Sequence, residues 1–160
     1  MRIIIAAVGR LKDGPERELF TRYSKRLDEQ GRSLSLGPMR LAELPEGRAA
    51  GTGQRRTDEA SRLLEAASEA ELKIALDGTG KAMTSEGLAK WLAGKRDGGT
   101  RALAFLIGGP DGHGPAVLEA ADLKLSLGPM TLPHGLARII LAEQLYRAAT
   151  ILAGHPYHRA

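Results

Sequence analysis

Apolar runs separated by amphipathic segments make up most of this chain. The strongest runs consist almost entirely of Ile, Leu, Val, Ala and Phe, which is typical of strands buried on both faces of a sheet. Such runs predict strands at residues 2–8, 72–77, 101–107 and 123–127, and a loose alternation of apolar and polar residues predicts another at residues 33–41. Because glycine weakens strand structure, Gly78 and Gly80 are expected to stop the strand that begins at residue 72.

Segments with apolar residues at helical spacing lie between these strands. They predict helices at residues 15–30, 57–68, 85–95, 117–121 and 135–153. Pro15 suits the first turn of the first helix, Gly31 follows its end, and Thr84 or Ser85 caps the third. Residues 45–53, rich in Gly, Pro and Ala, predict a loop. Strands that alternate with helices indicate the α/β class, with a mostly parallel sheet and helices on both faces.

Composition narrows the possible functions only modestly. A chain of 160 residues favours one domain over residues 1–160. The absence of cysteine excludes disulfides, thiolate zinc sites and cysteine nucleophiles. The net charge of +4 is compatible with a polyanionic partner. The N-terminal apolar run is too short for a signal peptide, and no run approaches the ~20 residues of a membrane helix, so we expect a cytoplasmic protein.

Ligands of open α/β sheets bind beyond the carboxyl ends of the strands, and three such ends are unusual here. The first, Leu76–Lys81, contains two glycines, for which a plain tight turn is the favoured explanation on this segment alone. The second, Ile107–Gly114, has four glycines, which let the backbone approach a nucleotide-like ligand, although a structural turn explains them too. It lacks the Lys-Ser/Thr pair of a phosphate-binding loop. Asp111 and His113 are interpreted as turn residues.

The third segment, Leu125–His134, is an irregular loop with apolar side chains. Its two prolines and one glycine prevent regular structure, while Leu127, Met130 and Leu132 are apolar. Free backbone N–H and C=O groups in such a loop are suited to reading the edge of a flat ring such as adenine. The alternative is a buried connection that serves stability alone.

The last helix and the tail suggest partners. The helix is apolar on nearly all sides, so we expect its second face to pack on another copy of the chain in a homodimer. Glu143 and Arg147 are spaced to form a local ion pair. The tail after Gly154 combines His, Tyr and Arg, which suit RNA contacts, although a frayed terminus is the plain alternative. His155 and His158 without a third ligand do not indicate a metal site.

Six segments, in order, resemble the RlmH-type methyltransferases of the SPOUT superfamily, bacterial enzymes that methylate 23S rRNA. The matching segments are Ile3–Lys12, Ser85–Ala89, Phe105–Gly109, Met130–His134, Glu143–Ala148 and Pro156–Arg159. Single segments of this kind are weak signals. Their shared order and spacing over essentially the full length identify the chain as a member of this family.

The resemblance implies an α/β fold whose C-terminal part forms a deep trefoil knot, although knots are nearly absent among proteins in general. It implies S-adenosyl-L-methionine as methyl donor, with no metal. The implied cofactor-binding residues are Leu76, Gly108, Leu127, Gly128, Pro129, Met130, Thr131 and Leu132. The implied substrate is N3 of pseudouridine 1915, in helix 69 of 23S rRNA within the 70S ribosome. The enzyme would be a homodimer in which the tail of one subunit lies near the cofactor of the other.

The resemblance leaves the proton acceptor undetermined, because N3 of pseudouridine must lose a proton before it attacks a methyl group. The catalytic candidates are His134, Tyr157, His158 and Arg159. Tyr157 and Arg159 are favoured for holding RNA, and the sequence does not rank His134 against His158. Arg22, Lys25, Arg26, Arg55 and Arg56 are candidates for phosphate contacts or for solvated surface.

One departure concerns the cofactor loop, where relatives often have Ser-Lys and this chain has Gly128-Pro129. The change removes any lysine-dependent role, but backbone contacts need no particular side chain. Two other functions remain alternatives. A nicotinamide-dependent reductase is disfavoured because no GxGxxG follows the first strand. A ribosome-binding factor that keeps the fold without the chemistry stays open.

Overall fold

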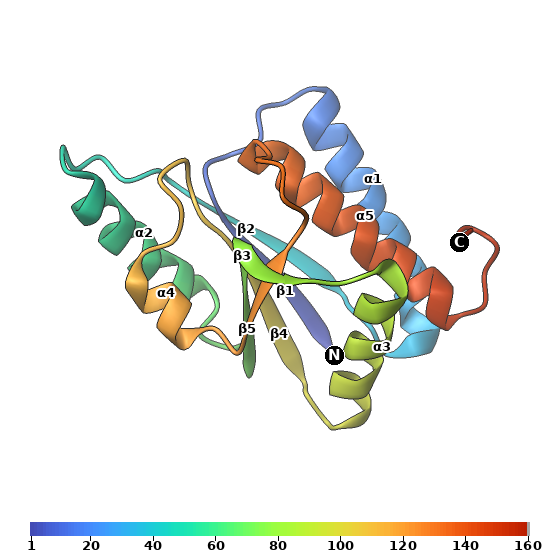
Figure 1. The fold of residues 1–160 in the computed structure, drawn as a ribbon. Coiled ribbons are helices and arrows are strands. Elements are labelled where there is room, and N and C mark those ends of the chain that lie inside the picture. The colour runs from blue at the N-terminus through green and yellow to red at the C-terminus, as the bar shows by residue number, and fades with distance from the viewer. Residues whose placement is uncertain (160) are drawn as a thin grey trace.

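Five parallel strands form the central sheet in the order β2-β1-β4-β3-β5. A computed structural model describes residues 1–159 of the chain. The strands are β1 (Arg2–Val8), β2 (Met39–Leu44), β3 (Leu72–Ala82), β4 (Ala102–Ile107) and β5 (Leu123–Ser126). The predicted α/β class with a parallel sheet is confirmed. Because all strands run the same way, their carboxyl ends meet at one edge (Figure 1).

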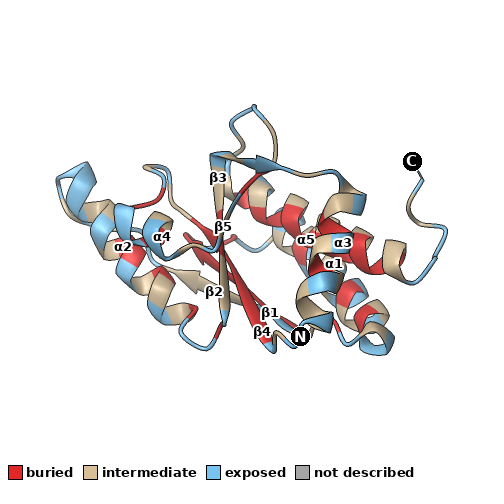
Figure 2. Ribbon diagram, turned by 60° about the horizontal axis from the view of Figure 1, so that its bottom comes forward, coloured by how far each residue is buried: buried red, intermediate tan, exposed pale blue. Residues whose placement is uncertain are grey.

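Helices cover both faces of the sheet, as predicted. One layer contains α1 (Pro15–Gly31), α3 (Ser85–Asp97) and α5 (His134–Leu152), and the other contains α2 (Thr52–Ala66) and α4 (Pro115–Ala120) (Figure 1). Alternate residues of β1 enter two separate hydrophobic cores, with Ile3 and Ile5 in one and Ile4 and Ala6 in the other. Figure 2 shows the buried residues concentrated along the strands and the inner helix faces. The sheet is therefore a buried platform for the loops at its edge.

Two predicted boundaries differ from the structure. Residues 33–41 are not one strand, because a 3₁₀ turn occupies Arg32–Leu34 and Ser35 has φ of 54°, so pairing with β1 begins only at Met39. Helix α2 begins at Thr52 rather than residue 57, which shortens the predicted loop. Ala160, the last residue of the predicted tail, lies outside the described residues.

Strand β3 continues past the glycines that were expected to stop it. Leu125 pairs first with Leu76 and again with Lys81, so the residues between them form a bulge and the strand resumes on the same partner. A Cβ atom on Gly80 would lie 2.6 Å from the carbonyl carbon of Lys124. Glycine is needed here for a close approach between strands, and for this reason it does not end β3.

Helix α5 is covered within its own chain, contrary to the reasoning that left one face for a partner. It packs on α1 and α3 as well as on the sheet, and ten of its residues are buried in the single chain. The premise that a terminal helix contacts only its own sheet was wrong, because α1 and α3 flank it. Large exposed apolar side chains lie instead at its amino end, at Met130 and Leu136. No helix in residues 1–159 is long and apolar enough to span a membrane.

Candidate functional site

A cavity of about 670 Å³ opens at the carboxyl ends of β4 and β5 and at the bulge of β3. All eight residues predicted to bind the cofactor line it, and His134 lines it as well; the eight are Leu76, Gly108 and Leu127 to Leu132. Its size lies within the range of small-molecule sites in proteins. The three glycine-rich or irregular strand ends, far apart in the sequence, therefore form one cavity.

The loop after β4 folds tightly back on Gly108. A Cβ atom on Gly108 would lie 3.1 Å from the carbonyl carbon of Gly112 and 3.2 Å from Nδ1 of His113. Gly112 has φ of +78°, a conformation that favours glycine. The glycines of this segment therefore serve a close backbone packing that forms one wall of the cavity.

His113 is a cavity residue that the sequence interpretation assigned only to the turn. Its side chain is buried, and Nε2 lies 3.1 Å from the carbonyl oxygen of Leu106, to which it donates. Burial lowers the pKa of His113 below its ordinary value, which favours the neutral ring. Nδ1 is then an acceptor, and it has no partner among the described residues. The signal that could have identified His113 was its place in the glycine-rich segment that follows β4.

Asp77 is a second cavity residue that the prediction missed. Its carboxylate accepts hydrogen bonds from the backbone N–H of Thr79 at 2.8 Å and from the Thr79 hydroxyl at 2.6 Å. These hydrogen bonds lower the pKa of Asp77, so it presents a fixed negative charge at the cavity. Asp77 directly follows Leu76, which was predicted to bind the cofactor. A charged residue next to that position was the signal that could have identified Asp77.

The loop after β5 supplies the apolar side of the cavity. Gly128 has φ of +126°, and the Ser126 hydroxyl hydrogen-bonds both the N–H and the carbonyl oxygen of Gly128, each at 3.1 Å. This turn displays the backbone of the following residues. Met130 is 81% exposed, which is unusual for a large apolar side chain in a single folded chain. The loop therefore combines an apolar surface with accessible backbone groups.

Helix α2 supports the loop after β4. Arg55 donates from Nε to Asp111 at 2.8 Å and from Nη1 to the carbonyl oxygens of Ala49 and Ala50. The hydrogen bond from Arg55 lowers the pKa of Asp111. Arg55, a candidate for phosphate contact, is therefore engaged within the protein. Glu59 is buried below the same loop and accepts from the N–H of Gly47 at 2.7 Å.

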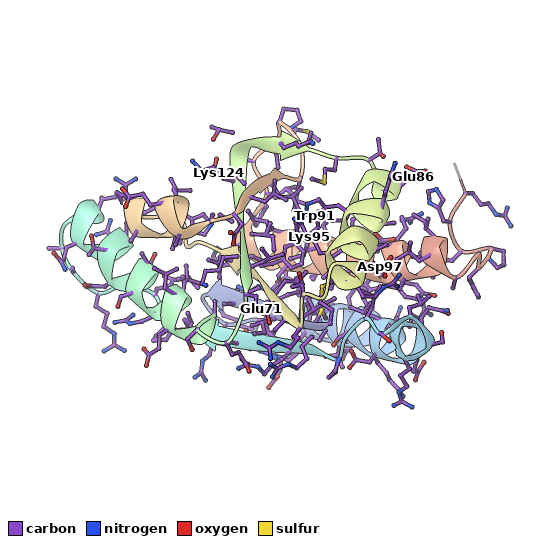
Figure 3. The ribbon with its side chains drawn as sticks, turned by 90° about the horizontal axis from the view of Figure 1, so that it is seen from below. Glu71, Glu86, Trp91, Lys95, Asp97 and Lys124 are labelled. Atoms are coloured by element: carbon purple, nitrogen blue, oxygen red, sulfur yellow. The ribbon has the colours of Figure 1, made fainter. Side chains whose placement is uncertain are left out.

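The tail residues do not reach this cavity. Tyr157 donates its hydroxyl hydrogen to Glu143 at 3.0 Å, and its ring packs at a tilt of 55° against Tyr146 with ring centres 4.7 Å apart. His158 lies 2.6 Å from the carboxylate of Glu86, which is labelled on the first turn of α3 in Figure 3. Helix α5 separates the tail from His134 by 19 residues, about 28 Å of helix. Within one chain the catalytic candidates therefore form two groups.

Contacts around the tail define the state of Tyr157. Burial, followed by hydrogen bonding to Tyr23 and Glu143, raises the pKa of Tyr157, so its hydroxyl stays protonated at neutral pH. The Arg147 guanidinium lies 5.0 Å from the ring centre of Tyr157 and pairs with Glu143 at 2.6 Å. The local ion pair expected between Glu143 and Arg147 is confirmed. Arg159 is exposed.

The fold and cavity define an α/β protein with a nucleotide-sized site at the carboxyl edge of a parallel sheet. The family profile described as "Predicted SPOUT methyltransferase" matches residues 1–158. The chain therefore belongs to the SPOUT methyltransferase family. In residues 1–159, no group of three or more His, Asp or Glu side chains is arranged to hold a metal.

Individual relatives agree with this assignment. The chain is 51% identical over 160 residues to a protein of Brucella anthropi, and the match covers 100% of both chains. It is also 51% identical over 160 residues to a protein of Xanthobacter autotrophicus, again over 100% of both. Both relatives are called Ribosomal RNA large subunit methyltransferase H. Among solved structures, a probable methylase family protein from Haemophilus influenzae shares the fold, with a TM-score of 0.55, 11% identity and coverage of 99% of this chain and 70% of that one.

Proposed function

We propose that this protein methylates N3 of pseudouridine 1915, in helix 69 of 23S rRNA, using S-adenosyl-L-methionine as methyl donor and the assembled 70S ribosome as substrate. The observation that carries the proposal is the single cavity formed by all eight predicted cofactor residues. Family membership and the names of the full-length relatives support rRNA as the class of substrate. Residues 1–160 would act as one methyltransferase domain in the cytoplasm.

The cavity suits S-adenosylmethionine in size and chemistry. The loop 127–132 offers apolar side chains and free backbone groups to the adenine ring, as expected for a purine site. The unpartnered Nδ1 of His113 and the cradle at Gly108, which a Cβ atom would fill, mark the opposite wall. Asp77 places a negative charge where a cationic ligand benefits from it. The cofactor supplies a methyl group on a sulfonium, which is transferred by direct displacement.

The chain's own residues would bind and orient the base and remove its proton. His134 lines the cavity and is the candidate proton acceptor that belongs to the same chain as the cofactor. Tyr157 keeps its proton, so its role is to donate hydrogen bonds or stack rather than to act as a base. Arg159 is suited to holding phosphate or the anionic base. His158 is the alternative proton acceptor.

A homodimer reconciles the two groups of candidates. The tail lies at the opposite end of α5 from the cavity, so it reaches a cofactor only on a second copy of the chain. The exposed Met130 and Leu136 at the cavity end are the apolar side chains available to such a contact. We also propose the family's trefoil knot in the C-terminal part of the chain. It is supported by family membership.

Transfer of tritiated methyl groups to ribosomes tests the proposal. The protein is incubated with tritiated S-adenosylmethionine and with 70S particles from a strain that lacks the modification. Free 23S rRNA and separated 50S subunits serve as matched substrates. We expect incorporation into 23S rRNA of the 70S particles and far less into the other two. Equal labelling of all three substrates would contradict the 70S requirement, and no labelling of any would contradict the activity.

A further inference from the structure

One fully buried arginine joins the first turn of α5 to the end of β1. The side chain of Arg138 has no exposed surface. Its Nη2 lies 3.2 Å from the carbonyl oxygen of Val8, and its Nη1 lies 3.2 Å from that of Gly9. A charged group is rarely buried completely, because its desolvation is costly unless partners compensate for it.

The partners of Arg138 extend to the amino end of α1. Nη1 also pairs with Oε2 of Glu43 at 3.1 Å, and the other oxygen of Glu43 accepts from Arg17 at 2.7 Å. The backbone N–H of Leu11 donates to Glu43 at 2.6 Å. Partial burial alone would raise the pKa of Glu43, but the hydrogen bonds from Arg17 and Leu11 lower it, so the carboxylate stays charged opposite Arg138.

The position of this network is unusual for a device that serves stability alone. Replacing buried ion pairs by apolar residues of similar volume is often neutral or stabilising, so the Arg138–Glu43 pair is weak evidence for a purely stabilising role. Arg138 instead lies one helical turn after His134, and its Nε lies 3.4 Å from the His134 carbonyl oxygen. Residue 134 is also where the loop 127–133 ends and α5 begins.

The His134 ring lies beside Gly9, the residue that follows β1. A Cβ atom on Gly9 would lie 3.3 Å from Nε2 of His134. The two carbonyl groups that bind Arg138 are those of Gly9 and of the residue before it. Arg138 therefore ties the start of α5 to Val8 and Gly9, and the His134 ring lies beside Gly9.

We propose that Arg138, held by Glu43, is a positioning residue of the methyl-donor site. Its guanidinium fixes the helical end of loop 127–133 and the His134 side chain against β1. The inference rests on the proposed function only in identifying the ligand of that loop as S-adenosylmethionine. The restraint on the loop is a property of the chain itself and can be measured without any ligand.

Four variants separate positioning from stability. Arg138→Met removes the charge and all hydrogen bonds at similar volume, and Arg138→Lys keeps the charge without the planar fork. Leu92→Ala is the matched control, because Leu92 is buried in the same core on α3 but does not line the cavity. Glu43→Gln removes the charge that pairs with Arg138, and it tests the same contact if Arg138→Met fails to fold.

Amide hydrogen exchange, calorimetric binding of S-adenosylmethionine and thermal unfolding are measured for each variant. Loss of the hydrogen bonds that orient the ligands of a metal site typically costs about 10–100-fold in affinity, and by analogy we expect about tenfold weaker binding for Arg138→Met. Exchange at residues 130–137 should rise, and Arg138→Lys should be intermediate in both measurements. Leu92→Ala should lower the unfolding temperature while leaving binding and exchange at 130–137 unchanged.

Two results would overturn the inference. One is unchanged exchange and unchanged binding in folded Arg138→Met or Glu43→Gln. The other is that Leu92→Ala weakens binding as much as Arg138→Met does when the two variants lower the unfolding temperature by the same amount. Failure of the unaltered protein to bind S-adenosylmethionine would instead contradict the proposed function, and the exchange at residues 130–137 would still decide the role of Arg138.

Discussion

Bulk at Gly108 should weaken cofactor binding while the fold persists. A Cβ atom there lies 3.1 to 3.2 Å from the carbonyl group of Gly112 and from Nδ1 of His113, which is closer than side chains normally pack. Alanine therefore forces a shift of a few tenths of an ångström, whereas the two further carbons of valine have no space without displacing the loop. Overpacking of this kind typically costs about 1–3 kcal/mol.

The effect should appear in affinity because the displaced loop is a wall of the cavity. If the strain falls on the bound form, a cost of about 1–3 kcal/mol corresponds to roughly 5–150-fold weaker binding, since about 1.4 kcal/mol is tenfold. Isothermal calorimetry with S-adenosylmethionine measures this for Gly108→Ala and Gly108→Val. Gly78→Ala is the matched control, because Gly78 lines the same cavity and a Cβ atom there meets nothing within 4 Å. Binding by Gly108→Val that equals the unaltered protein would refute the reasoning.

Three further predictions concern the tail and the buried histidine. Deletion of residues 155–160, or Arg159→Ala, should abolish methylation and leave S-adenosylmethionine binding near normal in calorimetry; unchanged activity on ribosomes would remove the tail from the site. Mixing the tail-deleted chain with Gly108→Val should restore methylation in heterodimers. The Gly108→Val chain then supplies the tail and the tail-deleted chain supplies the bound cofactor, which completes one site only if the tail acts on the partner's cofactor. No recovery in proven heterodimers would place the tail in its own subunit. Burial lowers the pKa of His113 below 6.5, so the unfolded chain binds the proton first and stability falls as pH drops below about 6.5. His113→Leu should flatten that part of the stability profile in urea unfolding, and an unchanged slope would contradict the buried neutral ring.

Much of the fold and cavity could be predicted from the pattern of residues. Continuous apolar runs at β1 and β4 correctly predicted buried parallel strands, because only such strands lack a polar face. Parallel strands bring their carboxyl ends to one edge, so glycine-rich segments distant in sequence were expected to lie near one another. The eight cofactor candidates consequently line one cavity.

Other features depend on tertiary contacts that local patterns do not contain. The sequence does not show that Gly80 contacts the Lys124 carbonyl, so its role in a bulge was mistaken for the end of a strand. The packing of α1 and α3 on α5 joins segments that are distant in the sequence. Because the prediction did not include this packing, it wrongly argued that one face of α5 was left uncovered in the single chain. The sequence gives no signal for Arg138, because its partners lie far away in the chain, at the end of β1 and on β2.

The most direct test of the central claim is the position of the methyl group. Ribosomes from a strain that lacks this protein are treated with the protein and S-adenosylmethionine, and the 23S rRNA is analysed by nuclease mapping and mass spectrometry. We predict one added methyl group, on N3 of pseudouridine 1915. A methyl group on another nucleotide or another atom, or an unmodified helix 69 despite bound cofactor, would contradict the account.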